Sequence, residues 1–220
     1  MCADTPALLR RDPMNRPLTL TLCVLILAVA PPADADTATV SFCDETLPAD
    51  TKKFTCKKES VRDVSPLAKL TNLAELRVRS TEVRDVSPLA SLTNLTLLDL
   101  GQTEVSDASA LASLENLENL NLDGTEVSDV RPLASLTNLT HLDLSETKVS
   151  DVSALASLTN LTHLNLDDTE VSDVSALASL TNLKWLNIYG AEVSEAQAIA
   201  LYEKLPKCRI EHFALRHINP

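Results

Sequence analysis

Glycine and aromatic residues are scarce in this chain of 220 residues. It contains three glycines, one tryptophan, two tyrosines and three phenylalanines, while 45% of its residues are hydrophobic. A core with so few aromatic rings has to be built from leucine, valine and alanine. The chain also has no Gly-rich phosphate loop, no Cys-x-x-Cys pair and no recognisable Ser-His-Asp arrangement. These absences argue against an enzyme, and we expect no cofactor.

Positive charge is also in short supply. The chain has 19 Lys and Arg against 31 Asp and Glu, which gives a formal net charge of -12 at pH 7. A chain of this charge is repelled by nucleic acid and by anionic lipid surfaces. We therefore expect no nucleic-acid-binding role and no role on a membrane surface.

The first 35 residues have the pattern of a secretory signal peptide. Arg16 supplies positive charge, residues 18–30 are mainly apolar, and Ala33-Asp34-Ala35 is an A-x-A cleavage site. A membrane-spanning helix needs roughly 20 apolar residues, and Pro31-Pro32 ends this run too early. We expect translation to start at Met14 and residues 1–35 to be removed. The mature chain would then be exported to the periplasm, the cell envelope or the medium, without stable membrane insertion.

One pattern recurs every 22 residues through most of the chain. In residues 141–145, Leu142 and Leu144 alternate with polar residues, which is the pattern of a strand with one buried face. Continuing the spacing places Cys208 and Ile210 in the columns of Leu186 and Ile188. The repeat therefore predicts an array over residues 51–213. Its clearest column consists of Leu70, Leu92, Leu114, Leu136, Leu158, Leu180 and, in the last unit, Tyr202.

Each unit also carries the signals of a short helical turn after its strand. Pro66, Pro88 and Pro132 lie where a first turn tolerates a missing N–H. No unit can bury its leucines alone, so the units are expected to stack into a solenoid. Aspartates able to cap the turns are Asp63, Asp85, Asp107, Asp129, Asp151 and Asp173. Asparagines expected to satisfy turn backbone are Asn72, Asn94, Asn116, Asn138, Asn160 and Asn182.

The string LTNLTHLDLSETKVSDVSALAS, residues 136–157, resembles the leucine-rich repeat. Its 22-residue length and V-S-D-V turn resemble the internalin-like bacterial subclass. The resemblance implies an α/β solenoid, a right-handed curved stack with a parallel β-sheet on the concave face and short helical or 3-10 turns on the convex face. Where the family usually has asparagine, this chain has Thr81, Thr103, Thr125, Thr147 and Thr169. A threonine hydroxyl can bond turn backbone, so we expect the turn to persist with a weaker polar ladder.

The two ends of a solenoid need covers, because they expose core and unpaired strand edges. Residues 36–50 are expected to form an N-terminal cap in which Val40, Phe42 and Cys43 fold over the first repeat. Cys56 points inward there, so we predict a Cys43–Cys56 disulfide worth about 3 kcal/mol. Cys208 lies at the other end of the stack and is expected to be a free, buried thiol. Residues 214–220 are expected to form a C-terminal cap or tail, with the last rung covered by Phe213, Leu215 and Ile218.

The side chains beside the buried strand leucines face outward, and they do not repeat. They are basic in the first units, acidic in the middle and aromatic near the end. Trp185 either covers the final rungs or anchors a partner. The first lysines and arginines either protect a sheet edge or recognise a partner. We predict a partner-binding site in the C-terminal half that consists of His141, Asp143, His163, Asn165, Asp167, Trp185, Asn187 and Tyr189.

The resemblance implies protein recognition. We interpret the chain as an exported, non-enzymatic, monomeric module that binds a protein partner on its concave face, with a cell-surface glycan as the alternative ligand. A metal-dependent hydrolase using His141, His163 and Asp143 is a different hypothesis, and a structural envelope component is another. A repeat brings His141 and His163 together whether or not a metal is bound, so we predict no metal site.

Overall fold

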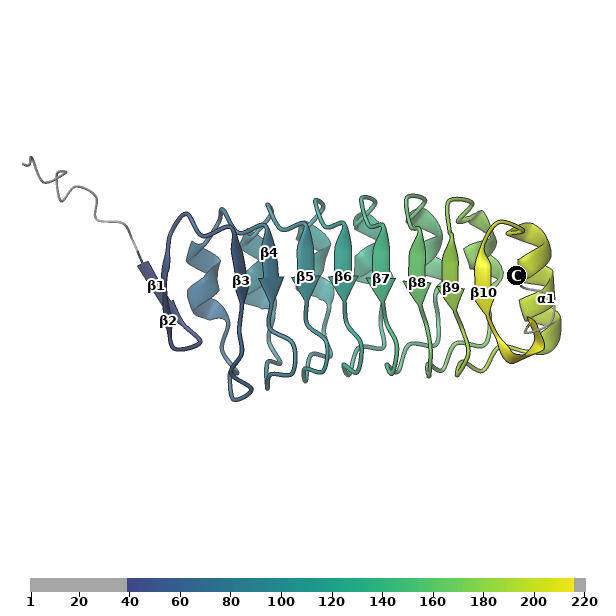
Figure 1. Cartoon of the computed structure of the whole chain (residues 1–220), viewed down its shortest axis with the longest axis horizontal. Helices are drawn as coiled ribbons and strands as arrows, with labels where there is room; N and C mark the ends of the chain where they lie inside the picture. Colours follow the sequence, from purple (N-terminus) through teal and green to yellow (C-terminus); the bar gives the residue numbers. More distant parts are fainter. Residues whose placement is uncertain (1–38, 216–220) are drawn as a thin grey trace, which may run out of the picture. The chain divides into compact units, whose positions relative to one another are not determined.

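A computed structural model describes residues 39–215 of the chain (Figure 1). The expected start at Met14, the signal segment 1–35 and Ile218 in the tail all lie outside the described residues.

The described residues form one parallel sheet of eight strands in chain order. Neighbouring strands pair in register, so that Leu76 lies beside Leu98 and Leu98 beside Leu120. The spacing of 22 therefore becomes one rung of the sheet, as the repeat predicts. The strands are β3 (Lys53–Thr55), β4 (Glu75–Arg77), β5 (Leu97–Asp99), β6 (Asn119–Asn121), β7 (His141–Asp143), β8 (His163–Asn165), β9 (Trp185–Asn187) and β10 (Arg209–Glu211).

Short 3-10 helices lie behind the sheet, one for each of six successive units (Figure 1). Pro66, Pro88 and Pro132 occupy their first turns, which confirms that prediction. The aspartates lie one position before the cap residue. Asp63 Oδ1, for example, accepts a hydrogen bond from the Ser65 backbone N–H at 2.7 Å. The helices are η1 (Ser65–Lys69), η2 (Ser87–Ser91), η3 (Ser109–Ser113), η4 (Arg131–Ser135), η5 (Ser153–Ser157) and η6 (Ser175–Ser179).

The threonine column holds each turn from inside. Thr81 is buried, and its hydroxyl donates to the Val78 carbonyl at 2.7 Å in the same repeat. The links between repeats come from the asparagine column instead, since Asn94 Nδ2 donates to the Thr71 carbonyl of the preceding unit at 2.8 Å. The same bond is made by Asn116, Asn138, Asn160 and Asn182, and it satisfies turn backbone at an exposed flank of the stack, not buried backbone.

The described chain begins with an antiparallel hairpin of β1 (Thr39–Phe42) and β2 (Glu45–Pro48). Val40 and Phe42 are buried. The Phe42 ring packs edge-on against the ring of Phe54 in β3, and the two ring centroids are 5.7 Å apart. A disulfide joins Cys43 to Cys56, whose Cα atoms are 5.7 Å apart. The hairpin thus covers the apolar end of the first repeat.

The last unit departs from the repeat. In place of a 3-10 helix it contains α1 (Glu195–Lys204), whose first turn is closed by a capping box between Ser194 and Gln197. Arg209 of β10 consequently pairs with Trp185, 24 residues earlier. The longer helix needs extra chain to return to the sheet, so the strict spacing ends at β9.

This change corrects three predictions. Ile210, not Cys208, lies beside Leu186. Tyr202 is only half-buried in α1, whereas Leu201 on the same helix and the C-cap residue Leu205 are buried. Phe213, at the start of η7 (Phe213–Leu215), is 55% exposed, while Leu215 is fully buried.

Cys208 lies in the loop before β10 as a free, buried thiol. Burial raises its pKa to about 12, so the reactive thiolate form is scarce at neutral pH. This chemistry fits a small core residue.

Candidate partner-binding site

The outward side chains of the sheet line up in rows, because parallel strands pair in register. We call this surface the display face. It comprises the first and last residues of β3 to β10, together with the residue two positions after each strand. The first row reads Lys53, Glu75, Leu97, Asn119, His141, His163, Trp185 and Arg209. The middle row reads Thr55, Arg77, Asp99, Asn121, Asp143, Asn165, Asn187 and Glu211.

A groove of about 330 Å³ is hollowed into the display face. Of the predicted site residues, it brings together His141, Asp143, His163, Asn165 and Trp185. Asp167, Asn187 and Tyr189 do not line it. The groove extends further toward the N-terminus than the sequence suggested, since its lining also includes Arg77, Leu97, Asp99, Asn119 and Asn121. Leu97 is the one aliphatic residue in a row of polar and aromatic residues on β3 to β10, and this was the signal in the sequence that could have placed the groove.

Aromatic rings form a continuous row along one side of the groove. The imidazoles of His141 and His163 are stacked, with ring centroids 4.4 Å apart and planes 6° apart. The Trp185 ring follows at 6.4 Å from His163. Burial, and then the charge of His163, lower the pKa of His141 below its usual 6.5. His141 is therefore a neutral ring at neutral pH.

Neighbouring polar groups hold each ring in place. The Thr140 and Thr162 hydroxyls lie 2.9 Å from Nδ1 of His141 and His163 respectively. Trp185 Nε1 donates to Glu211 Oε1 at 3.0 Å. Trp185 thus contacts the last strand and also lines the groove. Its role as a partner anchor stays a prediction.

The middle row has a structural role that sequence reasoning missed. In five consecutive strands a side-chain Oδ1 accepts a hydrogen bond from the backbone N–H two residues further on, which closes the turn after the strand. The signal was present as an unbroken Asp/Asn column with a period of 22. The acceptors are Asp99, Asn121, Asp143, Asn165 and Asn187, at distances of 3.1, 2.9, 2.9, 3.2 and 3.0 Å.

Comparison with known proteins agrees with this geometry. A family model described as leucine-rich repeats, two copies, matches residues 115–157. The solved structure of internalin F from Listeria monocytogenes is similar at 29% identity and a TM-score of 0.72, over 78% of this chain and 51% of that one. Internalin C2 from the same organism is similar at 27% identity and a TM-score of 0.71, over 80% of this chain and 82% of that one. The chain has the leucine-rich-repeat fold and is similar to the internalins.

The internalin-like chain spans about half the length of the internalin F structure. A leucine-rich-repeat protein of Leptospira interrogans shares the fold, with a TM-score of 0.63 at 18% identity over 73% of this chain and 48% of that one. No curated protein matches the chain.

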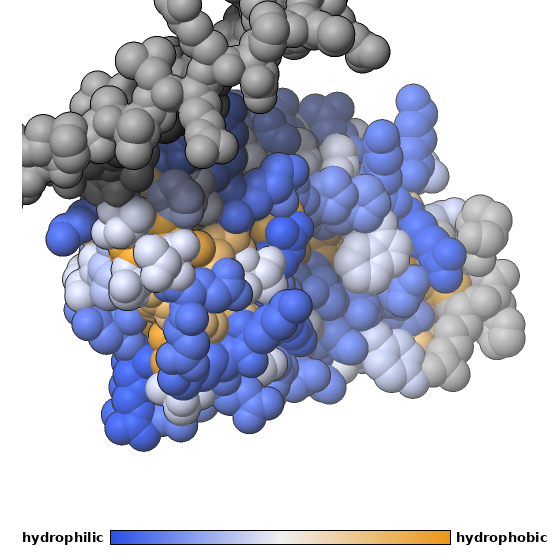
Figure 2. Space-filling model, turned by 60° about the vertical axis from the view of Figure 1, so that its left-hand side comes forward, coloured by the Kyte–Doolittle hydropathy of each residue, from blue (hydrophilic) through white to orange (hydrophobic). Residues whose placement is uncertain are grey.

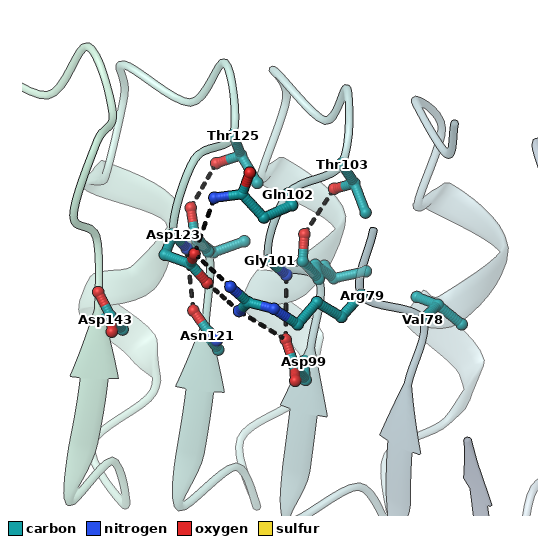
Figure 3. A network of polar contacts seen from close by, with 12 residues as sticks. Val78, Arg79, Asp99, Gly101, Gln102, Thr103, Asn121, Asp123, Thr125 and Asp143 are labelled. Carbon is teal, nitrogen blue, oxygen red and sulfur yellow. Dashed lines mark hydrogen bonds and ion pairs between the residues drawn. The ribbon is translucent and has the colours of Figure 1, made fainter. Parts of the chain in front are cut away.

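The basic residues of the display face are largely paired with acidic residues of the same face. Arg79 reaches across two rungs to Asp123, where its Nη2 donates to Oδ2 at 2.8 Å and its Nη1 to Oδ1 (Figure 3). Gln102 Nε2 also donates to Asp123, at 3.0 Å. Burial raises the pKa of Asp123, but the hydrogen bonds from Arg79 and Gln102 outweigh burial and lower it.

Gly101 makes this crossing possible. It lies between the two partners, and a Cβ there would collide with Arg79 and with the Asp123 carboxylate. At the edge of the sheet, Glu75 binds Lys53 at 2.6 Å and Arg77 at 3.2 Å. The N-terminal basic cluster therefore has internal partners.

The hydrolase alternative finds no support in the internalin-like chain. Within residues 39–215, no group of three or more His, Cys, Asp or Glu side chains is placed to hold a metal ion. On the face that Figure 2 displays, the described surface is mainly hydrophilic, and hydrophobic residues are visible only in small areas. Among the described residues the exposed large hydrophobic side chains are Tyr189 and Phe213, and no helix is long and apolar enough to cross a membrane.

Proposed function

We propose that this internalin-like protein is an exported, non-enzymatic, monomeric module that binds a protein partner on its display face. The groove in that face carries the proposal, because it is lined by side chains that differ from rung to rung. The opposite side repeats Ser, Asp and Ala, for instance in the identical η5 and η6 sequences. Specific recognition requires chemistry that does not repeat.

The aromatic row supplies the anchor of the proposed site. His141, His163 and Trp185 are held by neighbours before any partner arrives, so little side-chain freedom is lost on binding. Rings with a polar edge bury apolar area and also form hydrogen bonds, which is why such residues dominate binding energy at interfaces. Asp143, Asn165, Asp167, Asn187 and Tyr189 would contribute polar contacts around them.

Two observations support export. The Cys43–Cys56 disulfide is typical of oxidising compartments. Residues 1–35 have the pattern of a signal peptide. Intact-mass measurement of the exported protein should find a chain that starts near Asp36, and a mass that retains residues 14–35 would contradict cleavage.

The proposal is tested by affinity capture from an envelope extract with three proteins. These are the unaltered chain, a His163→Ala, Trp185→Ala double variant, and a Ser150→Ala control on an exposed position outside the groove. Ser157 would be a poorer control, since its hydroxyl donates to the Ala134 carbonyl of the preceding unit at 2.9 Å. A partner held by the display face is retained by the unaltered chain and the control, and is lost with the double variant.

Thermal unfolding of all three proteins separates binding from stability. A double variant that unfolds at an unchanged temperature and no longer captures the partner supports the proposal. Equal capture by all three proteins would place the binding site elsewhere. If the double variant has lost its fold, its failure to capture the partner says nothing about binding. Tyr189→Ala, at an exposed position on the same face, is then tested for capture and for its unfolding temperature in its place.

A further inference from the structure

Strands β5 to β7 contribute most of the groove lining. Asn119 on β6 lies between Leu97 and His141, which are its neighbours in the first row. All three are among the groove residues, as are Asp99 and Asp143 in the middle row. This part of the groove is thus lined by the apolar side chain of Leu97, the imidazole ring of His141 and two carboxylates.

The negative charge of these two aspartates is not required by the fold. The turn after each strand needs only an Oδ1 acceptor, and Asn121, Asn165 and Asn187 provide one with an amide. Asp143 uses Oδ1 for both the N–H and the hydroxyl of Ser145, at 2.9 and 2.6 Å. Within residues 39–215, Asp143 Oδ2 accepts no hydrogen bond and remains for a partner.

Arg77, which lines the groove, and the nearby Arg79 are each paired with a carboxylate. Arg79 binds Asp123 through both terminal nitrogens, and its Nη1 is 3.9 Å from Asp99 (Figure 3). Arg77 binds Glu75 at 3.2 Å. Asp99 is thus partly neutralised, whereas Asp143 has no ion pair within the described part of the chain. With a net charge of -12, the protein presents a negative field to an approaching partner.

We infer that the groove takes a lysine or arginine side chain from an extended basic segment of the protein partner. Its charged end binds the Asp143 carboxylate, with Asp99 adding to the field, and its alkyl stem lies between Leu97 and His141. Long basic side chains bury their stems on apolar surface, and an arginine also stacks on aromatic rings. Charge-assisted hydrogen bonds to a carboxylate are the strongest polar contacts such a segment can form. This inference rests on the proposed function, since it names the partner of the same face.

The probe is a phage library of random dodecapeptides, selected on the full purified protein. Parallel selections use Asp143→Asn and the matched control Glu146→Gln, which removes the same charge from an exposed residue outside the groove. Asp143→Asn keeps the turn bond, because asparagine occupies this row in three other strands. We expect lysine and arginine to be enriched on the unaltered protein and on Glu146→Gln, and about tenfold less on Asp143→Asn.

Affinities of one selected peptide complete the test. We expect binding about tenfold weaker with Asp143→Asn, a smaller loss with Asp99→Asn, no change with Glu146→Gln, and tighter binding with Asn165→Asp. Added salt should weaken binding to the unaltered protein more than to Asp143→Asn.

The outcomes distinguish this inference from the proposed function. Selected peptides without basic residues, or equal affinity for Asp143→Asn and the unaltered protein, would overturn the inference. If the envelope partner is lost with the His163 and Trp185 variant but retained by Asp143→Asn, the proposed function stands and the inference fails. Glycans bound in the groove with no dependence on Asp143 would also overturn it. If neither peptides nor envelope proteins respond to any display-face variant, both fail.

Discussion

His141 and His163 occupy equivalent positions of neighbouring repeats, so the repeat itself brings their rings to 4.4 Å. Two imidazolium ions at this distance repel each other, which opposes protonation of both rings. The same repetition lets equivalent positions differ in what they present to a partner. Asp143 and Asn165 close identical turns, but only Asp143 leaves a charge in the groove.

We predict that His141 titrates below its usual pKa of 6.5 in the folded protein. Burial disfavours its charged form first, and the charge of His163 adds to the effect. Proton NMR titration of the imidazole resonances measures this pKa directly. In His163→Gln the pKa of His141 should rise but remain below 6.5, because burial persists. A pKa at or above 6.5 in the unaltered protein would contradict the stacked arrangement.

The 3-10 helices each begin beside an aspartate that accepts a backbone N–H. Five residues are too few for a stable isolated helix, so each turn depends on this bond and on the burial of one leucine. α1 is different, since its ten residues and capping box support a helix that needs less help from its neighbours.

We predict that acid destabilises these turns. The pKa values of the capping aspartates are lowered by hydrogen bonds from the residue two positions further on, and for Asp129 the Arg131 side chain lowers the pKa to about 2. Because the folded pKa lies below the unfolded value, this stabilisation is complete above about pH 4 and is lost as the pH falls through the folded pKa. The unfolding temperature should therefore drop between about pH 4 and pH 2.

An Asp129→Asn, Asp151→Asn double variant provides the control. Asparagine keeps the acceptor oxygen but does not titrate, so the variant should lose less stability over the same pH interval. An identical pH profile for the variant and the unaltered protein would mean that other carboxylates cause the acid sensitivity.

The N-terminal hairpin should depend on its disulfide. Cys43 and Cys56 are 13 residues apart, and removing such a crosslink costs about 3 kcal/mol in the chain-entropy model. In a Cys43→Ser, Cys56→Ser variant we expect the Val40 and Leu47 amides to lose hydrogen-exchange protection, while the central strands keep theirs. Unchanged protection of the hairpin would show that the contact between Phe42 and Phe54 holds it without the crosslink.

The stack as a whole is quasi-one-dimensional, with each repeat contacting its two neighbours. One apolar core extends from the hairpin to Leu215, and its central leucines are fully buried. Stability therefore depends on continuity, since a defect in a middle rung weakens two interfaces and a defect at an end weakens one.

We expect Leu144→Ala, at a fully buried central position, to cost about 2–5 kcal/mol of unfolding free energy. Leu47→Ala is the matched end variant, because Leu47 is buried in the hairpin. Its cost should be smaller and confined to the first repeat. Chemical denaturation of both variants measures the difference, and equal costs would contradict a nearest-neighbour stack.

The spacing of 22 was sufficient to predict the parallel sheet from β3 to β9, the inward and outward sides of each strand, and the short helices behind them. A buried column tolerates no change of spacing, because a slip of one residue would turn every leucine outward. The outward columns are under no such constraint, so their variation pointed to the display face and to His141, His163 and Trp185.

Other features depend on contacts between side chains that are distant in the sequence. The shift at β10 arises because α1 is longer than a 3-10 helix, a difference that the column of Tyr202 did not reveal. The bond from Arg79 to Asp123 spans 44 residues and requires the space above Gly101. The groove is lined by side chains from β4 to β9, so it depends on which residues occupy equivalent positions of neighbouring strands. Periodicity specifies which backbone positions become neighbours, whereas the sizes and rotamers of the side chains at those positions determine what fills the space between them.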